Sequence, residues 1–384
     1  MVTCDALIVG GGPAGSTCAW QLRQAGLDVT VIDAATFPRD KVCAGWITPQ
    51  VVTALRLDTQ AYARRRTFQP ITGFRVGLID GHGETAVAYG RPVSFGIRRC
   101  EFDHYLLQRA DACLALGAPI AAIRRDRGQW IVNDALRAPM LVGAGGAGCP
   151  VARMLNGVRP GGPLVVAREA EARIEAAGGD SLGIDRGVPE LFFCRDLQGY
   201  GWCVRKGEYL NVGLGRLDRR SLPAATARFV AFLEARQKIP PGLPWRWRGH
   251  AYAVHASPRP RIVDAGVLLV GDAAGVADPQ SGEGIRQAVE SGLLAARTIV
   301  EARGRFSRDR LEPYAACLEA RFAGSPLSGT LARIVPGRVR TVVAGLLLEA
   351  PSFVRHVVLD HWFLHRRQLA LSSSSWPARP RNRL

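Results

Sequence analysis

Two carboxylates that follow short apolar runs are the residues whose positions most clearly predict chemistry. Asp33 ends one such run and Asp272 follows another, and each lies near a glycine-rich turn. A carboxylate at the end of a buried strand can accept hydrogen bonds from ribose or other polyol hydroxyls. Glycine lets the backbone come close to a ligand. The two positions therefore predict a ligand that carries both hydroxyl and phosphate groups.

The first glycine-rich turn runs from Gly10 to Gly15 and precedes a segment with helical character. In a dinucleotide-binding fold Gly10 makes the tight turn, Gly12 lets the backbone approach a pyrophosphate, and Gly15 allows helix and strand to pack closely. The pyrophosphate then lies at the helix N-terminus, where free N–H groups favour an anion. The predicted contacts of this segment are Gly10, Gly12, Pro13, Ala14, Gly15 and Asp33.

The second turn indicates which dinucleotide is bound. The run 266–270 leads into Gly271 and Asp272, and Gly282-Glu283-Gly284 then opens a long amphipathic helix. The carboxylate can hold a polyol chain, while amides at the helix start face an electron-rich ring and stabilise negative charge on it. Together the two turns favour FAD over NAD. The predicted contacts here are Gly271, Asp272, Pro279, Gly282, Gly284 and Ile285.

These turns require a parallel sheet to position them. Strands at Ala6–Val9 and Asp28–Asp33, separated by a helix at Ser16–Gln24, predict an α/β fold with a Rossmann-like FAD-binding domain. We expect an antiparallel-sheet substrate domain and a helical C-terminal segment in addition. The expected division is a discontinuous FAD-binding domain at 1–70, 96–160 and 256–305, a substrate domain at 71–95 and 161–255, a helical segment at 306–371 and a disordered tail at 372–384.

From Asp5 to about Tyr314 the sequence resembles the geranylgeranyl reductase branch of the flavoproteins with the p-hydroxybenzoate hydroxylase fold. The matching segments are Gly10–Gly15 with Asp33, Phe37–Cys43, Arg99–Asp103, Tyr200–Trp202, Asn211–Gly213 and Gly271–Gly284. The resemblance implies FAD in an extended form, with Arg99 directed toward the pyrophosphate or ribose and Asp272 on the ribityl chain. It also implies an active site between the flavin and a separate antiparallel sheet.

The sequence departs from that family in the region of the substrate. Trp46 stands where members of the branch carry a glycine, and Val204-Arg205 stands where they carry Phe-Pro. The indole predicts a narrower or reshaped pocket. The substrate is therefore expected to be apolar or polycyclic, and these two departures weigh against an isoprenoid.

A further glycine run, Gly143 to Gly148, formally fits the dinucleotide pattern GxGxxG. A second dinucleotide unit would need a helix and then a strand with an acid, for which 164–167 and Glu169 are available. Prolines and glycines between them leave room for little more than two helical turns. We therefore expect the strand before Gly143 to return to the FAD domain. The acid that the hydroxylases carry near this position is missing.

The candidate catalytic residues are Cys43, Trp46, Glu283 and His255. Cys43 can donate a proton beside the flavin or serve only as a small buried thiol, and Glu283 can face the flavin or only start a helix. Lys41 is a candidate contact to the flavin, with a solvated loop lysine as the alternative. The expected substrate pocket includes Tyr200, Trp202 and Tyr252, although aromatic strand residues often only fill a core.

We expect an FAD-dependent reductase in which NAD(P)H reduces FAD and a hydride passes to a carbon–carbon double bond. The alternative enzyme is a flavin-dependent monooxygenase or halogenase that first traps oxygen as a C4a adduct, which Trp46 favours somewhat. A prenyl-binding escort protein without redox chemistry is a third hypothesis. The intact glycine turns and Asp272 argue against it.

The composition excludes several classes of partner. Lys and Arg number 50 against 33 Asp and Glu, a net charge of +17, but only Lys41, Lys206 and Lys238 are lysines. An arginine-rich, glycine-rich composition is typical of a GC-rich coding background, and no nucleic-acid-binding motif accompanies it. The nine cysteines form no CxxC pair, and no metal site is indicated. We expect a cytoplasmic enzyme with a small-molecule substrate; the oligomeric state is left open.

The C-terminal stretch Val339–Leu371 is apolar and aromatic, with basic residues among the rings. One interpretation is an amphipathic element that covers the mouth of the substrate pocket or gives peripheral membrane contact. The interpretation that we prefer is a helical lid packed on the core.

Overall fold

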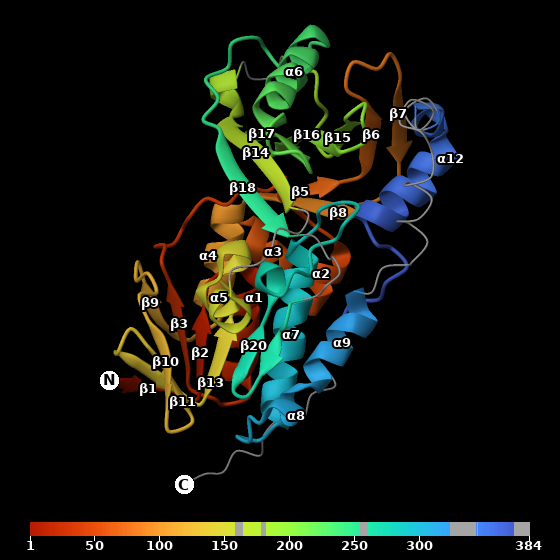
Figure 1. Cartoon of the computed structure of the whole chain (residues 1–384). Helices are drawn as coiled ribbons and strands as arrows, with labels where there is room; N and C mark the ends of the chain where they lie inside the picture. Colours follow the sequence, from red (N-terminus) through yellow and green to blue (C-terminus); the bar gives the residue numbers. More distant parts are fainter. Residues whose placement is uncertain (158–163, 178–181, 254–259, 323–342, 344, 372–384) are drawn as a thin grey trace.

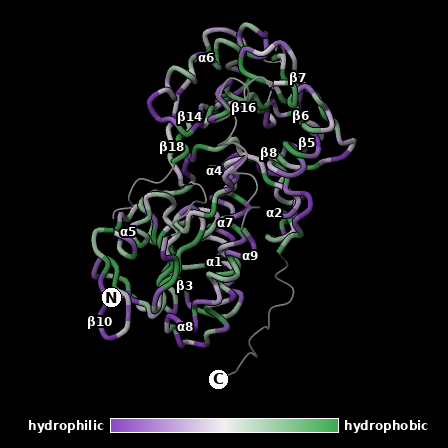
Figure 2. Tube along the Cα trace, turned by 45° about the vertical axis from the view of Figure 1, so that its right-hand side comes forward, coloured by the Kyte–Doolittle hydropathy of each residue, from purple (hydrophilic) through white to green (hydrophobic). Residues whose placement is uncertain are grey.

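The computed structural model describes residues 1–157, 164–177, 182–253, 260–322, 343 and 345–371 of the chain. Two large sheets dominate it, one in the lower and one in the upper half of Figure 1. Figure 2 shows hydrophobic stretches along the inner strands, such as β3, and hydrophilic ones on outer loops such as that near β10. His255 and the tail 372–384 lie outside the described residues.

In the described part of the chain, the lower sheet has six strands and is almost entirely parallel. Its order is β19 (Val263–Asp264), β20 (Val267–Leu269), β13 (Met140–Gly143), β2 (Ala6–Val9), β3 (Val29–Asp33) and β9 (Cys113–Leu116). All neighbours are parallel except β19 and β20. The three central strands are buried throughout, as a sheet covered on both faces requires.

The strand before the third glycine run joins this sheet, as expected, because β13 pairs with both β2 and β20. The 3₁₀ turn η1 (Gly146–Gly148) and α5 (Pro150–Asn156) follow it. Glu169 lies on β14 (Leu164–Arg173), which pairs with antiparallel partners in the other sheet. A second dinucleotide unit is therefore not formed.

One helix begins at each of the two glycine-rich turns, α1 (Pro13–Gln24) at the first and α7 (Ile285–Glu301) at the second. The helix α1 packs along α7, and Gly292 permits this because a Cβ there would overlap the carbonyl of Ala14. The N-termini of both helices consequently reach the same region. The helices α4 (Arg99–Arg109), α8 (Arg308–Leu311) and α9 (Pro313–Phe322) also belong to this half.

The upper sheet is antiparallel except where β15 and β6 pair. Its order is β18 (Arg248–Ala253), β14, β17 (Tyr209–Arg216), β16 (Gly199–Lys206), β15 (Glu190–Phe193), β6 (Gly73–Leu78) and β7 (Glu84–Ala88). The helix α6 (Leu222–Ala235) covers it on the side away from the lower sheet (Figure 1). The predicted α/β fold with an antiparallel second sheet is confirmed.

Two smaller sheets and several short helices complete the fold. One sheet comprises β1 (Val2–Thr3), β12 (Leu136–Ala138), β11 (Gln129–Val132) and β10 (Ile123–Asp126), and the other β4 (Trp46–Ile47), β8 (Ser94–Ile97) and β5 (Phe68–Ile71). The short helices are α2 (Pro49–Ala54), α3 (Thr59–Ala63), η2 (Ile174–Ala177) and η4 (Gly271–Ala273). Because β5 and β8 span two boundaries of the expected division, that division remains a proposal.

The C-terminal segment lies against the upper sheet. It includes α12 (Pro351–Phe353) and the π-type helix η5 (Val354–Phe363), and both contact β7. Val354, Val358 and Leu359 of η5 are buried in one cluster with side chains of the sheet. The apolar side of this helix thus faces the protein. Among the described residues, no helix combines the length and hydropathy needed to cross a membrane.

Candidate functional site

A cavity of about 650 Å³ lies between the two main sheets. Its walls come from the first and second turns, the loop around Cys43, strands β16 and β18, and Phe363 of η5. The predicted residues that line it are Gly10, Gly12, Pro13, Ala14, Asp33, Lys41, Cys43, Trp46, Arg99, Tyr200, Trp202, Tyr252, Gly271, Asp272, Pro279, Gly282, Glu283, Gly284 and Ile285. The fold therefore brings to one place residues from both ends of the chain.

The first turn forms a cradle of bare backbone at the end of β2. Gly10 adopts φ +115°, and a Cβ there would lie against the backbone of Ala144. Gly15 lies behind the turn, where a Cβ would overlap the carbonyl of Gly10, so its role is close packing. The Gly11 N–H donates to Asp33 Oδ2 at 2.7 Å, which fixes the carboxylate at the cavity edge. These features fit the adenosine and pyrophosphate part of a dinucleotide.

Two arginines share one buried carboxylate beside this turn. Arg99 donates two hydrogen bonds to Asp103, at 2.8 and 2.9 Å, and Arg39 Nη2 lies 3.3 Å from the same carboxylate. Both arginines line the cavity, and Asp103 is completely buried. One negative charge against two positive ones leaves an excess that suits a pyrophosphate. Arg99 was predicted in this role; Arg39 was not singled out.

Asp272 at the second turn faces two basic groups. The Nζ atom of Lys41 lies 2.6 Å from Nε2 of His250, which in turn lies 3.9 Å from Oδ2 of Asp272. Burial alone would raise the pKa of Asp272, but His250 and Lys41 lower it, so the carboxylate is ionised at neutral pH. Burial lowers the pKa of Lys41 to about 8, although Asp272 opposes that shift. An ionised acceptor beside two donors fits a polyol chain.

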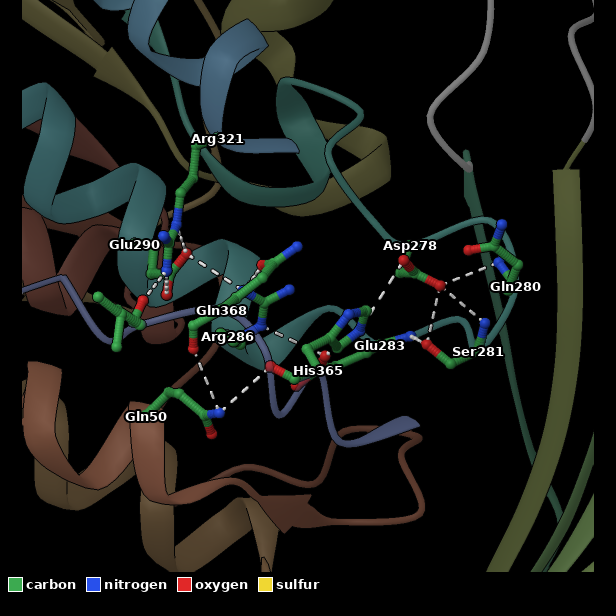
Figure 3. A network of polar contacts seen from close by, with 11 residues as sticks. Gln50, Asp278, Gln280, Ser281, Glu283, Arg286, Glu290, Arg321, His365 and Gln368 are labelled. Atoms are coloured by element: carbon green, nitrogen blue, oxygen red, sulfur yellow. Dashed lines mark hydrogen bonds and ion pairs between the residues drawn. The ribbon is translucent and has the colours of Figure 1, made fainter. Parts of the chain in front are cut away.

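Glu283 is held by a polar network that includes the C-terminal segment (Figure 3). Its Oε2 atom lies 3.0 Å from His365 Nε2 and 3.5 Å from Arg286 Nε. Burial opposes ionisation of Glu283, but His365 and Arg286 lower its pKa. The carboxylate is therefore a fixed negative charge at the cavity wall.

The loop around Cys43 is tied to the upper sheet. The Cys43 N–H donates to Glu169, and Asn211 Nδ2 donates to Oε1 of the same carboxylate at 3.1 Å. Trp202 Nε1 donates to Asn211 Oδ1 at 2.7 Å. Burial raises the pKa of Glu169 to about 7, although Lys206 opposes the shift. This chain of contacts holds Cys43 in place at the cavity wall. The Sγ atom of Cys43 accepts a hydrogen bond from the Gly45 N–H at 3.4 Å.

Burial also disfavours a charge on Glu171, two residues farther along β14. Lys206 Nζ and Arg98 Nε each lie 2.8 Å from the carboxylate of Glu171. Their positive charges outweigh the effect of burial and lower the pKa of Glu171 to about 2. Two neighbouring acids of one strand thus differ widely in proton affinity, because only Glu171 has two cations in direct contact.

Among the residues of the cavity wall that sequence reasoning did not single out are Arg39, His250 and Phe363, and it gave no site role to Glu169, which contacts the Cys43 loop. The alternation of His250 and Tyr252 along one strand was a usable signal, since both then point to the same face. Their rings stack with centroids 5.9 Å apart. Glu169 and Phe363 reach the site only through tertiary packing, and no local pattern marks them.

Comparison with known proteins agrees with this geometry. A family model described as FAD dependent oxidoreductase matches residues 5–92. The chain is 30% identical to menaquinone reductase of Mycobacterium tuberculosis over 325 residues, which cover 77% of this chain and 76% of that protein. It is 29% identical to geranylgeranyl diphosphate reductase of Rhodobacter capsulatus, with 77% of this chain and 75% of that one covered.

Among solved structures, a geranylgeranyl bacteriochlorophyll reductase-like protein from Thermoplasma acidophilum superposes with a TM-score of 0.74 at 20% identity. That match covers 96% of this chain and 98% of the other. A flavin-dependent brominase gives 0.68 at 19% identity, with 96% and 100% covered. These two likenesses concern the fold.

The match to a family model of FAD dependent oxidoreductases, together with this fold, defines an FAD-dependent oxidoreductase. Within that class, the chain belongs to the geranylgeranyl reductase family of flavoproteins. The predictions of the family, of an enzyme and of FAD as its cofactor are confirmed. The individual roles given to the site residues remain predictions.

Proposed function

We propose that this enzyme reduces a carbon–carbon double bond of an apolar substrate. The observation that carries the proposal is the continuity of the cavity, which runs from the cradle at Gly10 and Asp33 to an aromatic end at Trp46 and Phe363. A cofactor bound along the first part would present its far end to a substrate bound at the second. The names of the relatives, which are reductases of menaquinone and of geranylgeranyl compounds, support the reaction class.

In this proposal the protein's own residues hold the cofactor at defined points. The first turn and the pair Arg39 and Arg99 receive the pyrophosphate, and Asp272 with His250 and Lys41 receives the polyol chain. The N-terminal amides of α7 face the ring end. When bound, FAD supplies the hydride, and NAD(P)H is the proposed reductant that restores it.

A proton must accompany the hydride, and the cavity offers few groups that can provide it. Glu283 is a poor donor because its lowered pKa keeps it ionised at neutral pH. The hydroxyl of Tyr200 already donates to the carbonyl of Ser281. Cys43 and Tyr252 line the cavity, and burial raises the pKa of Tyr252, so its hydroxyl keeps its proton. We propose Cys43 as the first candidate donor and Tyr252 as the second.

The test is turnover without oxygen. The purified protein is loaded with FAD, reduced, and mixed under argon with prenyl diphosphates and a prenylated naphthoquinone. A product that gains two hydrogens, retained after later exposure to air, supports the proposal. Oxygenated or halogenated products formed only in air contradict it.

One observation favours the alternative of a monooxygenase or halogenase: the indole of Trp46 lines the substrate end of the cavity. Flavin-dependent halogenases also share the fold. The same experiment separates the two activities, since only the alternative requires oxygen. A colourless protein that does not take up FAD would instead favour the escort hypothesis.

We propose that the enzyme works in the cytoplasm on a substrate of small size. The packing of η5 against the upper sheet supports the lid interpretation of that helix. Membrane contact through the remaining C-terminal residues is tested by removing 372–384 and measuring binding to anionic liposomes at low and moderate salt. Binding that is lost on truncation and falls with salt would support contact.

A further inference from the structure

Three aromatic rings from distant parts of the chain line the substrate end of the cavity. Phe363, the last residue of η5, lines the cavity and is almost completely buried. Its ring centroid lies 5.2 Å from that of Tyr200, edge to face, and 6.2 Å from that of Trp46. Trp46 also packs edge to face on Phe74, at 6.2 Å. The rings support one another and form a continuous wall.

The C-terminal segment is anchored on both sides of Phe363. Before it, the Tyr89 hydroxyl donates to Asp360 Oδ1 at 3.0 Å. After it, His365 contacts Glu283, and Arg286 Nη1 donates to Gln368 Oε1 at 2.6 Å, as Figure 3 shows. Contacts on both sides, added to the burial of η5, fix the ring against the cavity.

One cavity must therefore serve both cofactor and substrate. Its 650 Å³ extend from Asp33 to Phe363, and the residues that fit a dinucleotide occupy much of that length. The substrate receives the part bounded by Trp46, Tyr200 and Phe363. A long flexible chain that continued past Phe363 would have to displace the anchored ring, whereas a short or planar apolar group can lie against the aromatic faces.

We propose that Phe363 is a specificity-determining residue, which with Trp46 limits the substrate to a compact apolar group, a ring system or a short prenyl unit. This inference deepens the proposed function and rests on it for the nature of the reaction. It concerns which molecules fit, and binding alone can test it.

The test titrates the oxidised, FAD-loaded protein with prenyl diphosphates of two, three and four isoprene units and with a naphthoquinone that carries one prenyl unit. Binding is followed by the change in flavin absorbance, without turnover. We expect the wild-type protein to bind the shortest chain and the ring compound at least tenfold more tightly than the longest chain. Phe363→Ala should bind the longest chain about tenfold more tightly than wild type does.

The matched control is Trp362→Ala, in the same helix. Trp362 packs edge to face on Phe353, with centroids 6.3 Å apart, and is not one of the residues that line the cavity. This variant should keep the wild-type preference within twofold. If Phe363→Ala does not fold, Trp46→Gly provides the same opening from another loop, and flavin content with thermal melting reports folding.

Equal affinity of the wild type for long and short chains would overturn the inference, as would an equal gain in Trp362→Ala and Phe363→Ala. Because the titration needs no reduction, it remains informative if the enzyme proves to be an oxygenase. Failure of the reductase proposal and failure of the size limit are thus read from different experiments.

Discussion

The two ends of the cavity are built in different ways. The cofactor end consists of backbone and charge: the bare turn at Gly10–Gly15, the carboxylates Asp33 and Asp272, and arginines that share Asp103. The substrate end consists of side-chain rings, Trp46 and Phe363 among them, that meet only in the folded chain. In the proposed function the first end receives groups common to every FAD molecule. The second end receives the substrate, and we therefore expect specificity to be decided there.

The largest effect is expected at the cofactor end. Gly12 has an extended backbone that any residue can adopt, and a Cβ there would meet only Arg39 Nη2, at 3.3 Å. Gly12→Val should fold but fill the space meant for the pyrophosphate, and so weaken FAD binding by about a hundredfold, close to 3 kcal/mol. Flavin content and a titration with FAD measure this.

Gly249→Val is the control, because Gly249 is exposed on β18 and a Cβ there meets only Ala167 O, at 3.9 Å. An unchanged affinity in Gly12→Val, or an equal loss in both variants, would contradict the account of the cradle.

Glu169 lies on β14 of the upper sheet and accepts a hydrogen bond from the Cys43 N–H, so it connects the Cys43 loop to that sheet. Its pKa is about 7 in the folded protein, against 4.5 for an ordinary glutamate. The folded state therefore binds the proton more tightly, and this group's contribution to stability falls as pH rises from about 4.5 to 7. Glu169→Gln should remove that part of the pH dependence, roughly 2–3 kcal/mol in the free energy of unfolding.

The measurement is the melting temperature of the wild type and of Glu169→Gln from pH 5 to 8. The quantity compared is the slope of melting temperature against pH. Glu171→Gln is the contrasting variant. Its pKa of about 2 means that its stabilisation is present above pH 4.5 and is lost only at lower pH. Parallel curves for the wild type and Glu169→Gln between pH 5 and 7 would argue against a proton on Glu169.

A smaller effect is expected when one of the paired arginines is removed. Arg39→Met keeps the length of the side chain but leaves Asp103 with Arg99 alone, so the excess positive charge disappears. FAD binding should weaken about tenfold and depend less on salt. Arg23→Met, whose pairs with Asp28 and Asp111 are distant from the cavity, is the control. Salt dependence equal to that of the wild type would show that Arg39 does not meet the pyrophosphate.

The smallest effect concerns the anchor of the substrate end. His365→Ala removes one contact of the C-terminal segment with Glu283 and leaves the others in place. We expect the longest prenyl diphosphate to bind about threefold more tightly, with FAD affinity unchanged. His356→Ala, on the exposed side of the same segment, should have no effect. If both histidine variants behave alike, the contact of His365 does not position Phe363.

The same contrast explains what could be predicted from the sequence. The glycine turns, Asp33 and Asp272 were predictable because each lies within a few residues of the strand and helix that position it. The parallel sheet and the return of β13 to it followed from the same local signals. Phe363 and Glu169 were not predictable, because packing between segments far apart in the chain decides where they lie. Arg39 lay within a motif already noted but was not given a role.

The central claim is that reduced enzyme delivers hydride to an alkene without help from oxygen. Stopped-flow mixing under argon of the FAD-loaded, reduced protein with the prenyl diphosphates and the prenylated naphthoquinone tests it most directly. The account predicts that at least one compact substrate reoxidises the flavin and gains two hydrogens in proportion, and that the product keeps both hydrogens when air is admitted. A flavin that stays reduced until air enters, with oxygenated or halogenated product appearing only then, would contradict it.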